Sequence, residues 1–194
     1  LDPLRYYLLK EVSFGNDGSI SKDKLVSCIN SDLANNFGNL CQRVLAFTEK
    51  NLSLKVPKPD TFHDVDLNLL NNFSKKYKNL IDLIDNQNIN LYMNFIVDQM
   101  FIANKYFNDQ EPWNKKNDIK RLNTIIYVSF ELIRKISLLL YPVIPNTSLK
   151  ALSMFNLKEN DLNIDTIKNN TFLEPNLEIN KIDILFNKIK TTYD

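Results

Sequence analysis

The chain has 194 residues, of which 44% are hydrophobic and 24% are charged, an ordinary composition for one soluble globular domain with a small appendage. Its 24 basic and 23 acidic residues give a net charge of +1, which argues against a protein that coats nucleic acid nonspecifically. Three glycines cannot build a P-loop or a GxGxxG fingerprint, and the longest apolar runs are too short for a membrane span.

Catalytic and metal-binding side chains are scarce. His63 is the only histidine, so no zinc site or histidine pair can form around it, and we interpret it as a solvated residue near a helix start. Cys28 and Cys41 form no CxxC pair and fall within a helical pattern, so we expect two reduced thiols, as in a cytosolic protein. The chain is therefore expected to be non-catalytic by itself and to bind neither metal nor cofactor.

The first residues read as a short helix followed by a turn. We expect Asp2 to cap a helix in DPLRYYLLKEV, with Pro3 in its first turn. The stretch FGNDGSIS then carries Gly15 and Gly18, which tolerate the positive φ angles of tight turns.

Apolar residues at three- and four-residue spacing predict four longer helices, over residues 21–47, 67–84, 91–106 and 119–140. The last is apolar on most sides, so we expect it at the centre, ended by Pro142 and Pro145. A shorter helix follows Asn146, and looser helical and extended segments lead to NKIDILFNKIK, which again has helical spacing. No strand alternation persists, so the prediction is an all-α antiparallel bundle.

Asn39 and Arg43 lie one turn apart on one face of the first long helix, beside its apolar stripe. An amide beside a guanidinium can read nucleobase edges and phosphates, because the amide donates and accepts while the guanidinium offers a planar fork. An ordinary polar rim with an intrahelical contact explains the same spacing, so both interpretations stay open.

Trp113, the only tryptophan, follows Pro112 in the polar stretch QEPWNKKND. A ring on a stiff, polar turn can stack on an unpaired base, or it can fold back and plug the end of the bundle. Four basic residues surround it in the sequence: Lys115, Lys116, Lys120 and Arg121.

Three segments in this order resemble methionyl-tRNA synthetases of class I. LRYYLLKEV followed by FGNDGSIS resembles the segment just downstream of that family's KMSKS loop. DLANNFGNLCQR carries its Asn-Leu-x-x-Arg element, here Asn39 to Arg43, and YFNDQEPWNKK carries its Pro-Trp loop. The likeness extends over roughly residues 1–155, beyond which the chain diverges.

The resemblance implies roles for particular residues in recognition of the CAU anticodon. Trp113 would stack on or border the first base, cytosine, and Asn39 and Arg43 would contact the anticodon bases from the neighbouring helix. Pro112 would hold the loop in shape, and Asn108 stands where the family often has an aspartate.

The resemblance also implies a division of the chain and a larger parent protein. Residues 1–21 would end the stem-contact region, and residues 22–194 would form the anticodon-binding helical bundle with a divergent C-terminal extension. The parent would be a cytoplasmic methionine–tRNA ligase that uses ATP with magnesium and binds a methionine tRNA, with no membrane involved. Its catalytic domain, with the HIGH and KMSKS motifs and a zinc-bearing insertion, is expected before Leu1, so this fragment would bind neither ATP nor methionine.

Two alternatives remain at this stage. One is the helical domain of a related class I synthetase, for valine, isoleucine, leucine or cysteine. The Asn39–Arg43 pair and the Pro112–Trp113 loop argue against it. The other is a helical protein-interaction module without an RNA partner, in which Trp113 is buried and Arg43 is merely solvated.

Overall fold

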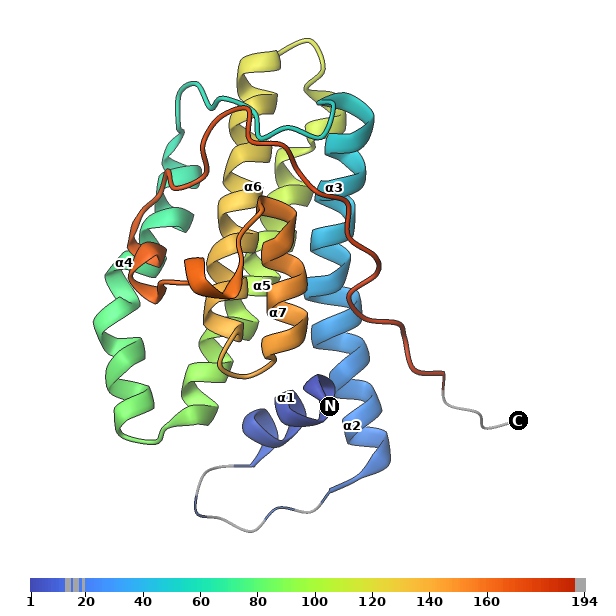
Figure 1. Ribbon diagram of the computed structural model, residues 1–194, viewed down its shortest axis with the longest axis vertical. Coiled ribbons are helices and arrows are strands. Elements are labelled where there is room, and N and C mark those ends of the chain that lie inside the picture. Colours follow the sequence, from blue (N-terminus) through green and yellow to red (C-terminus); the bar gives the residue numbers. More distant parts are fainter. Residues whose placement is uncertain (13–14, 16–17, 19, 191–194) are drawn as a thin grey trace.

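The computed structural model describes residues 1–12, 15, 18 and 20–190. In these residues the chain folds into a bundle of antiparallel helices with one isolated β-bridge, between Lys55 and Glu178 (Figure 1). The longer elements are α1 (Asp2–Glu11), α2 (Lys22–Cys28), the π-helical segment η1 (Ile29–Gly38), α3 (Asn39–Asn51), α4 (Asp64–Asp85), α5 (Ile89–Gln110), α6 (Ile119–Leu140) and α7 (Pro145–Leu152). Four short 3₁₀ helices complete the set: η2 (Pro112–Asn114), η3 (Ser153–Phe155), η4 (Glu159–Asp161) and η5 (Ile164–Lys168).

The first long helix is one continuous rod, made of α2, η1 and α3 without a break between them. Its apolar stripe is buried as the spacing predicts, with Leu33, Phe37, Leu40 and Val44 all fully inaccessible. The π-helical middle was not predicted, because a wider turn changes the backbone hydrogen bonds without interrupting the apolar pattern. Cys28 and Cys41 are free, buried thiols within this rod, as expected.

Helix α6 is the central element, as its all-round apolar pattern predicts. It contacts α3, α4, α5 and α7, and its observed bounds agree with the predicted range 119–140 (Figure 1). Three of its charged residues are nevertheless fully buried: Glu131, Arg134 and Lys135. Buried charges are tolerated only when they are paired and hydrogen-bonded, so their partners decide what packs on this helix.

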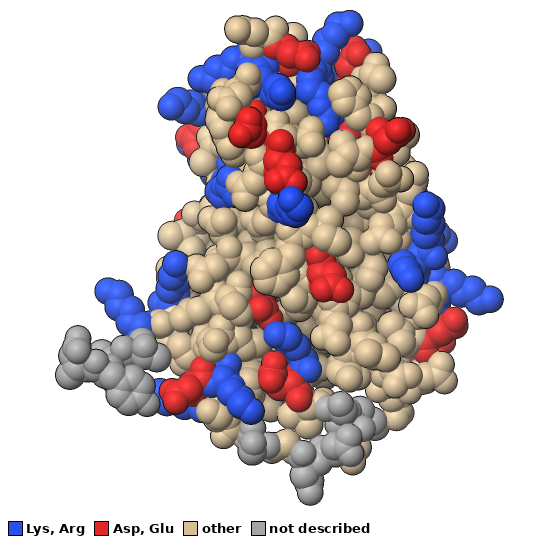
Figure 2. All heavy atoms as spheres, turned by 180° about the vertical axis from the view of Figure 1, so that it is seen from behind, with Lys and Arg blue, Asp and Glu red and all other residues tan. Residues whose placement is uncertain are grey.

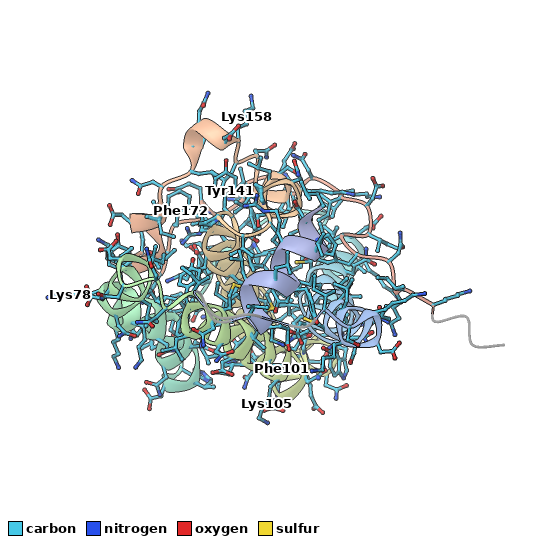
Figure 3. The ribbon with its side chains drawn as sticks, turned by 90° about the horizontal axis from the view of Figure 1, so that it is seen from below. Lys78, Phe101, Lys105, Tyr141, Lys158 and Phe172 are labelled. Atoms are coloured by element: carbon cyan, nitrogen blue, oxygen red, sulfur yellow. The ribbon has the colours of Figure 1, made fainter. Side chains whose placement is uncertain are left out.

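Most of those partners come from the C-terminal segment, by which we mean residues 156–190 after η3. Glu131 accepts hydrogen bonds from the backbone N–H groups of Phe172 and Leu173, both at 2.7 Å, and pairs with Arg134 at 2.8 Å. The Phe172 ring covers the Arg134 guanidinium at 4.4 Å and lies on the opposite side of the molecule from Phe101 (Figure 3). These contacts bind the C-terminal segment to the centre of the bundle.

Lys135 is held by the same segment. Its ammonium donates to the Ile167 carbonyl at 2.7 Å, to Asn170 Oδ1 at 2.9 Å and to the Leu70 carbonyl at 3.4 Å. The pKa of Lys135 is lowered to about 7, chiefly by burial and also by the neighbouring Arg134 charge, while Glu131 acts in the opposite direction.

The predicted cap of the first helix is wrong, because Asp2 caps a different helix. Leu1 is the N-cap of α1, without a side-chain hydrogen bond. The Asp2 carboxylate instead accepts from the Thr147 backbone N–H at 2.8 Å, from the Thr147 hydroxyl at 2.9 Å and from Asn146 at 3.2 Å, in the first turn of α7. A carboxylate there satisfies exposed N–H groups and suits the helix dipole, so α1 is fixed to α7.

The predicted turn in FGNDGSIS falls largely outside the described residues. Gly15 has a φ angle of +84°, the conformation for which glycine was expected. Residues 13, 14, 16, 17 and 19 are not described.

The helical spacing of NKIDILFNKIK is misleading, because residues 180–190 contain no helix. The segment is extended and runs beside the rod of α2, η1 and α3 (Figure 1). Contacts with that rod take the place of the hydrogen bonds of a helix. Asn30 and the backbone of Ile189, for example, exchange two hydrogen bonds of 2.9 Å.

Arg121 is not part of a basic surface around the tryptophan, as the sequence suggested, because it is only 8% exposed and is bound to Asp66. Its guanidinium donates to both carboxylate oxygens, at 2.5 and 2.9 Å. Asp66 also accepts from the Tyr106 hydroxyl at 2.7 Å and the His63 backbone N–H at 2.8 Å. His63 is the exposed N-cap of α4, as expected, so the cluster joins the ends of α4, α5 and α6.

We predict that Asp66→Asn lowers the free energy of unfolding by about 3–5 kcal/mol, because it leaves the buried Arg121 charge without its partner. Burial acts to raise the pKa of Asp66, but hydrogen bonds from Arg121, Tyr106 and His63 outweigh it and lower the pKa. The stabilisation is therefore complete above the unfolded pKa, near 4, and is lost as the pH falls through the lower folded value. Urea unfolding of both proteins at several pH values measures the difference. The control is Asp64→Asn, an exposed carboxylate in the same first turn, and an equal loss in the control contradicts the prediction.

A second prediction concerns Lys135→Met. The lysine pKa of about 7 lies below its unfolded value, so between pH 7 and 10 the unfolded chain binds a proton that the folded chain lacks. Wild-type stability relative to Lys135→Met should then rise with pH across this window, by on the order of 1 kcal/mol per pH unit. Denaturant unfolding at pH 7, 8 and 9 tests it, with the exposed Lys50→Met as control. A pH-independent difference would show that Lys135 stays charged in the fold.

Candidate nucleic-acid interface

A sharp reversal of the chain presents Trp113. Helix α5 ends at Glu111, whose φ angle of +45° is left-handed, and the 3₁₀ turn η2 follows at once. Pro112 is buried in this turn, and the Lys115 N–H donates to its carbonyl at 3.1 Å. The proline thus anchors the loop and leaves the next side chain at the surface.

The Trp113 ring packs on the end of the bundle and also remains accessible. It meets the buried Phe107 ring edge to face, with 6.1 Å between centroids and 67° between planes. Forty per cent of Trp113 is still exposed. The ring therefore packs against the bundle and stays partly accessible to solvent, rather than being buried as a plug.

Arg43 lies beside both aromatic rings. Its guanidinium carbon is 5.1 Å from the Phe107 centroid and 5.9 Å from the Trp113 centroid, within the range of cation–π attraction. One terminal nitrogen donates to Asn108 Oδ1 at 2.7 Å. Burial lowers the pKa of Arg43, but an arginine keeps its charge at neutral pH, so this edge of the bundle presents an oriented cation.

Asn39 lies one helical turn before Arg43 and is exposed. Within the described residues its side chain makes no hydrogen bond to Arg43, Asn108 or any other group. It lines a separate hollow with Asn35 and Gln42. The structure therefore brings together three of the predicted residues, Arg43, Asn108 and Trp113, on the buried support of Pro112, and places Asn39 beside them.

Phe107 is a site residue that the sequence did not reveal. It contacts Trp113 and Arg43, and the Phe47 ring meets its other edge at 6.4 Å. Its position one turn before the end of α5 was the only available signal. Such a signal is weak, because buried phenylalanines are common in helices.

The surroundings of the loop are less basic than the sequence suggests. Arg121 is buried with Asp66, and Lys120 lies 3.6 Å from Asp60. Lysines and arginines still gather at the end of the bundle that carries the α5–α6 loop, among several acidic side chains (Figure 2). Electrostatic attraction of a polyanion such as RNA would therefore be confined to this end of the bundle.

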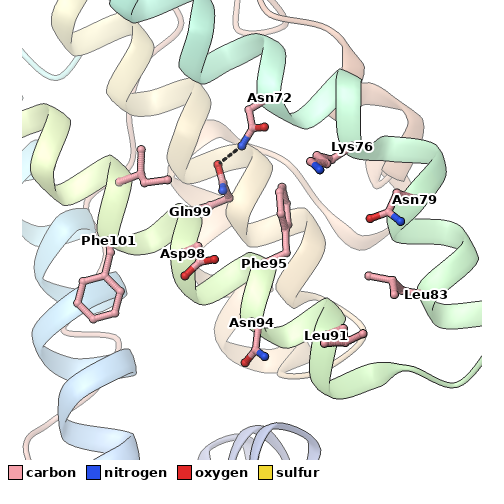
Figure 4. A pocket seen from close by; sticks show the side chains of 11 residues that line it. Asn72, Lys76, Asn79, Leu83, Leu91, Asn94, Phe95, Asp98, Gln99 and Phe101 are labelled. Carbon is pink, nitrogen blue, oxygen red and sulfur yellow. Dashed lines mark hydrogen bonds between the residues drawn. The ribbon is translucent and has the colours of Figure 1, made fainter.

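A larger, open hollow of about 690 Å³ lies between α4 and α5 (Figure 4). Amide and apolar side chains both line it; Asn72 donates to Gln99 at 3.1 Å, and Phe101 is 55% exposed at one end. In the described part of the chain, no group of three or more His, Cys, Asp or Glu side chains is arranged to hold a metal ion. None of the described helices is long and apolar enough to cross a membrane.

Comparison with known proteins agrees along nearly the whole chain. Residues 56–193 match the family described as "Anticodon binding domain of methionyl tRNA ligase", and residues 1–45 match "tRNA synthetases class I (M)". The methionine–tRNA ligase of Brucella suis is 39% identical over 155 residues, which are 79% of this chain and 30% of the relative. That of Thermotoga maritima is 33% identical over 190 residues, 97% of this chain and 30% of the relative.

Solved structures give the same result. The apo crystal structure of Mycobacterium tuberculosis methionyl-tRNA synthetase superposes with a TM-score of 0.92 and 34% identity, covering 98% of this chain and 39% of that one. The same enzyme has been solved in complex with methionyl-adenylate, and that structure matches with a TM-score of 0.89 and 35% identity, covering 95% of this chain and 37% of that one. This chain spans about 30% of the length of the curated relatives. It belongs to the methionyl-tRNA ligase family and, over residues 56–193, to the anticodon-binding domain of that family.

Proposed function

We propose that this chain recognises the CAU anticodon loop of a methionine tRNA. The observation that carries the proposal is the half-exposed Trp113 ring, held by Phe107 and flanked by the Arg43 guanidinium. An aromatic ring with one free side binds an unstacked base, and a neighbouring arginine contacts base edges or phosphate. The family of the chain supports the same partner.

Each site residue then has a distinct task. The open side of Trp113 stacks on the first anticodon base, cytosine, while Pro112 fixes the loop. Asn108 occupies one guanidinium nitrogen and so orients the remaining N–H groups of Arg43 outward. Asn39 contacts a base from the adjacent turn of the same helix. The site is organised before RNA binds, which limits the entropic cost of recognition.

We further propose that the whole protein is a cytoplasmic methionine–tRNA ligase that uses ATP with magnesium. A related enzyme binds methionyl-adenylate, which is in accord with ATP use. The catalytic domain would lie in the same chain, with residues 1–21 as its stem-contact link to the anticodon-binding bundle of residues 22–194. The contribution of this part to the reaction is positioning of the tRNA rather than chemistry.

We predict that Trp113→Ala weakens binding of a CAU anticodon stem-loop by about 1–3 kcal/mol, roughly 5- to 150-fold, because a base-stacking surface is lost. Preference for CAU over a loop with a changed first base should fall as well. Fluorescence anisotropy at one stated salt concentration measures both loops, and circular dichroism checks the helical signal. Phe101→Ala, which removes an exposed aromatic ring of α5 away from the loop, is the matched control. If the wild-type protein binds both loops equally well, the proposed recognition of the first anticodon base is wrong.

The substitution Arg43→Lys tests whether RNA recognition needs the planar shape of the Arg43 guanidinium or only its positive charge. Lysine keeps the positive charge but lacks the planar fork that reaches Asn108 and the RNA together. We expect discrimination between the two loops to drop by about 1–3 kcal/mol while the salt dependence is retained. Lys50→Arg, on the exposed end of α3, is the control. Full discrimination by Arg43→Lys would mean that Arg43 acts only as a point charge.

A further inference from the structure

The extended C-terminal segment is anchored along the helical rod that carries Asn39. Asn30 donates to the Ile189 carbonyl and accepts from its N–H, both at 2.9 Å. Phe186 is only 9% exposed and packs where the rod has Gly38. A Cβ at Gly38 would lie 3.4 Å from the Phe186 ring, an ordinary contact distance, so the ring lies directly against this turn of the rod.

A hollow of about 190 Å³ remains between the rod and this segment. From the rod it is lined by Ala34, Asn35, Gly38, Asn39 and Gln42, and from the segment by Ile184, Phe186 and Lys188. The lining thus combines three amides, several apolar side chains and one ammonium.

The position of the hollow relates it to the ring cluster. On a helix of about 100° per residue, Arg43 lies roughly 40° to one side of Asn39 and Gln42 roughly 60° to the other. Arg43 contacts Trp113, whereas Gln42 borders the C-terminal segment. The exposed strip of the helix at Asn39 therefore has Trp113 on one side and the C-terminal segment on the other.

The lining has the chemistry of a nucleotide site. Amides donate hydrogen bonds to base edges and accept hydrogen bonds from them, and apolar side chains such as Phe186 can pack on the face of a base. Lys188 is exposed, and within the described residues it forms no ion pair, so its charge is available to a phosphate. By contrast, Lys181 of the same segment is paired with Glu49.

We propose that this hollow is a second nucleotide site, next to the site at Trp113. Lys188 binds a backbone phosphate there, and Gln42 contacts the base that follows the one stacked on Trp113. The C-terminal segment is thereby a wall of the RNA site as well as a structural strap. This inference rests on the proposed recognition of an anticodon loop.

The test compares Lys188→Ala with Lys190→Ala, a lysine two residues along the segment that does not line the hollow. Binding of the CAU stem-loop is measured from low to moderate salt. Lys188→Ala should weaken binding roughly tenfold and reduce the slope of log K against log salt by about 0.7, the value for one phosphate of a single strand. Preference at the first base should be unchanged. Gln42→Ala should lower the preference at the second base alone.

The outcomes distinguish this inference from the proposed function. Absence of stem-loop binding by the wild type overturns both. If Trp113→Ala weakens binding but Lys188→Ala does not, the first site stands and the second is overturned. Equal effects of Lys188→Ala and Lys190→Ala also overturn it, because the segment would then act as diffuse charge. Both lysines are exposed, so circular dichroism should report the same fold for all variants.

Discussion

Asp66 is the point on which the geometry of the site depends. Its buried carboxylate accepts hydrogen bonds from Arg121 at the start of α6, from Tyr106 near the end of α5 and from the backbone at the start of α4. A buried carboxylate is costly unless all its acceptor positions are used, so the three helix ends cannot move apart independently. The α5–α6 loop connects two of these helix ends, so the contacts of Asp66 also restrict the position of Trp113.

A second buried cluster applies the same constraint to the other side of the molecule. Glu131, Arg134 and Lys135 interrupt the apolar surface of α6, and the C-terminal segment supplies most of their hydrogen-bond partners outside α6. The segment is therefore held at the centre of the bundle before it crosses to the rod of α2, η1 and α3 (Figure 1). Two buried ionic clusters, each inside the bundle, thus fix the two elements that flank the exposed face of α3.

The sequence predicted features that depend on neighbouring residues of the chain, and it missed contacts between residues that are far apart in the chain. The period of apolar residues predicted α6 at its observed bounds, because burial along one helix is a local pattern. It could not reveal that Asp2 caps a helix 145 residues later, or that Arg121 binds a carboxylate 55 residues earlier. It misread residues 180–190, where tertiary contacts outweigh helical spacing. Spacing alone left Arg43 and Trp113 unconnected and only the resemblance placed them in one site, whereas the fold shows Arg43 in contact with both Asn108 and Trp113.

Asn108 shows how a nearly neutral chain can present an effective cation. The side chain at this position is in contact with Arg43, and an aspartate there would neutralise the guanidinium while holding it. An amide oxygen fixes the same nitrogen but leaves the full charge and the other N–H donors for a ligand. Phe107 and Trp113 add attraction through their ring faces without adding negative charge. With a net charge of only +1, the proposed preference for one RNA loop would come from such local arrangement rather than from bulk attraction.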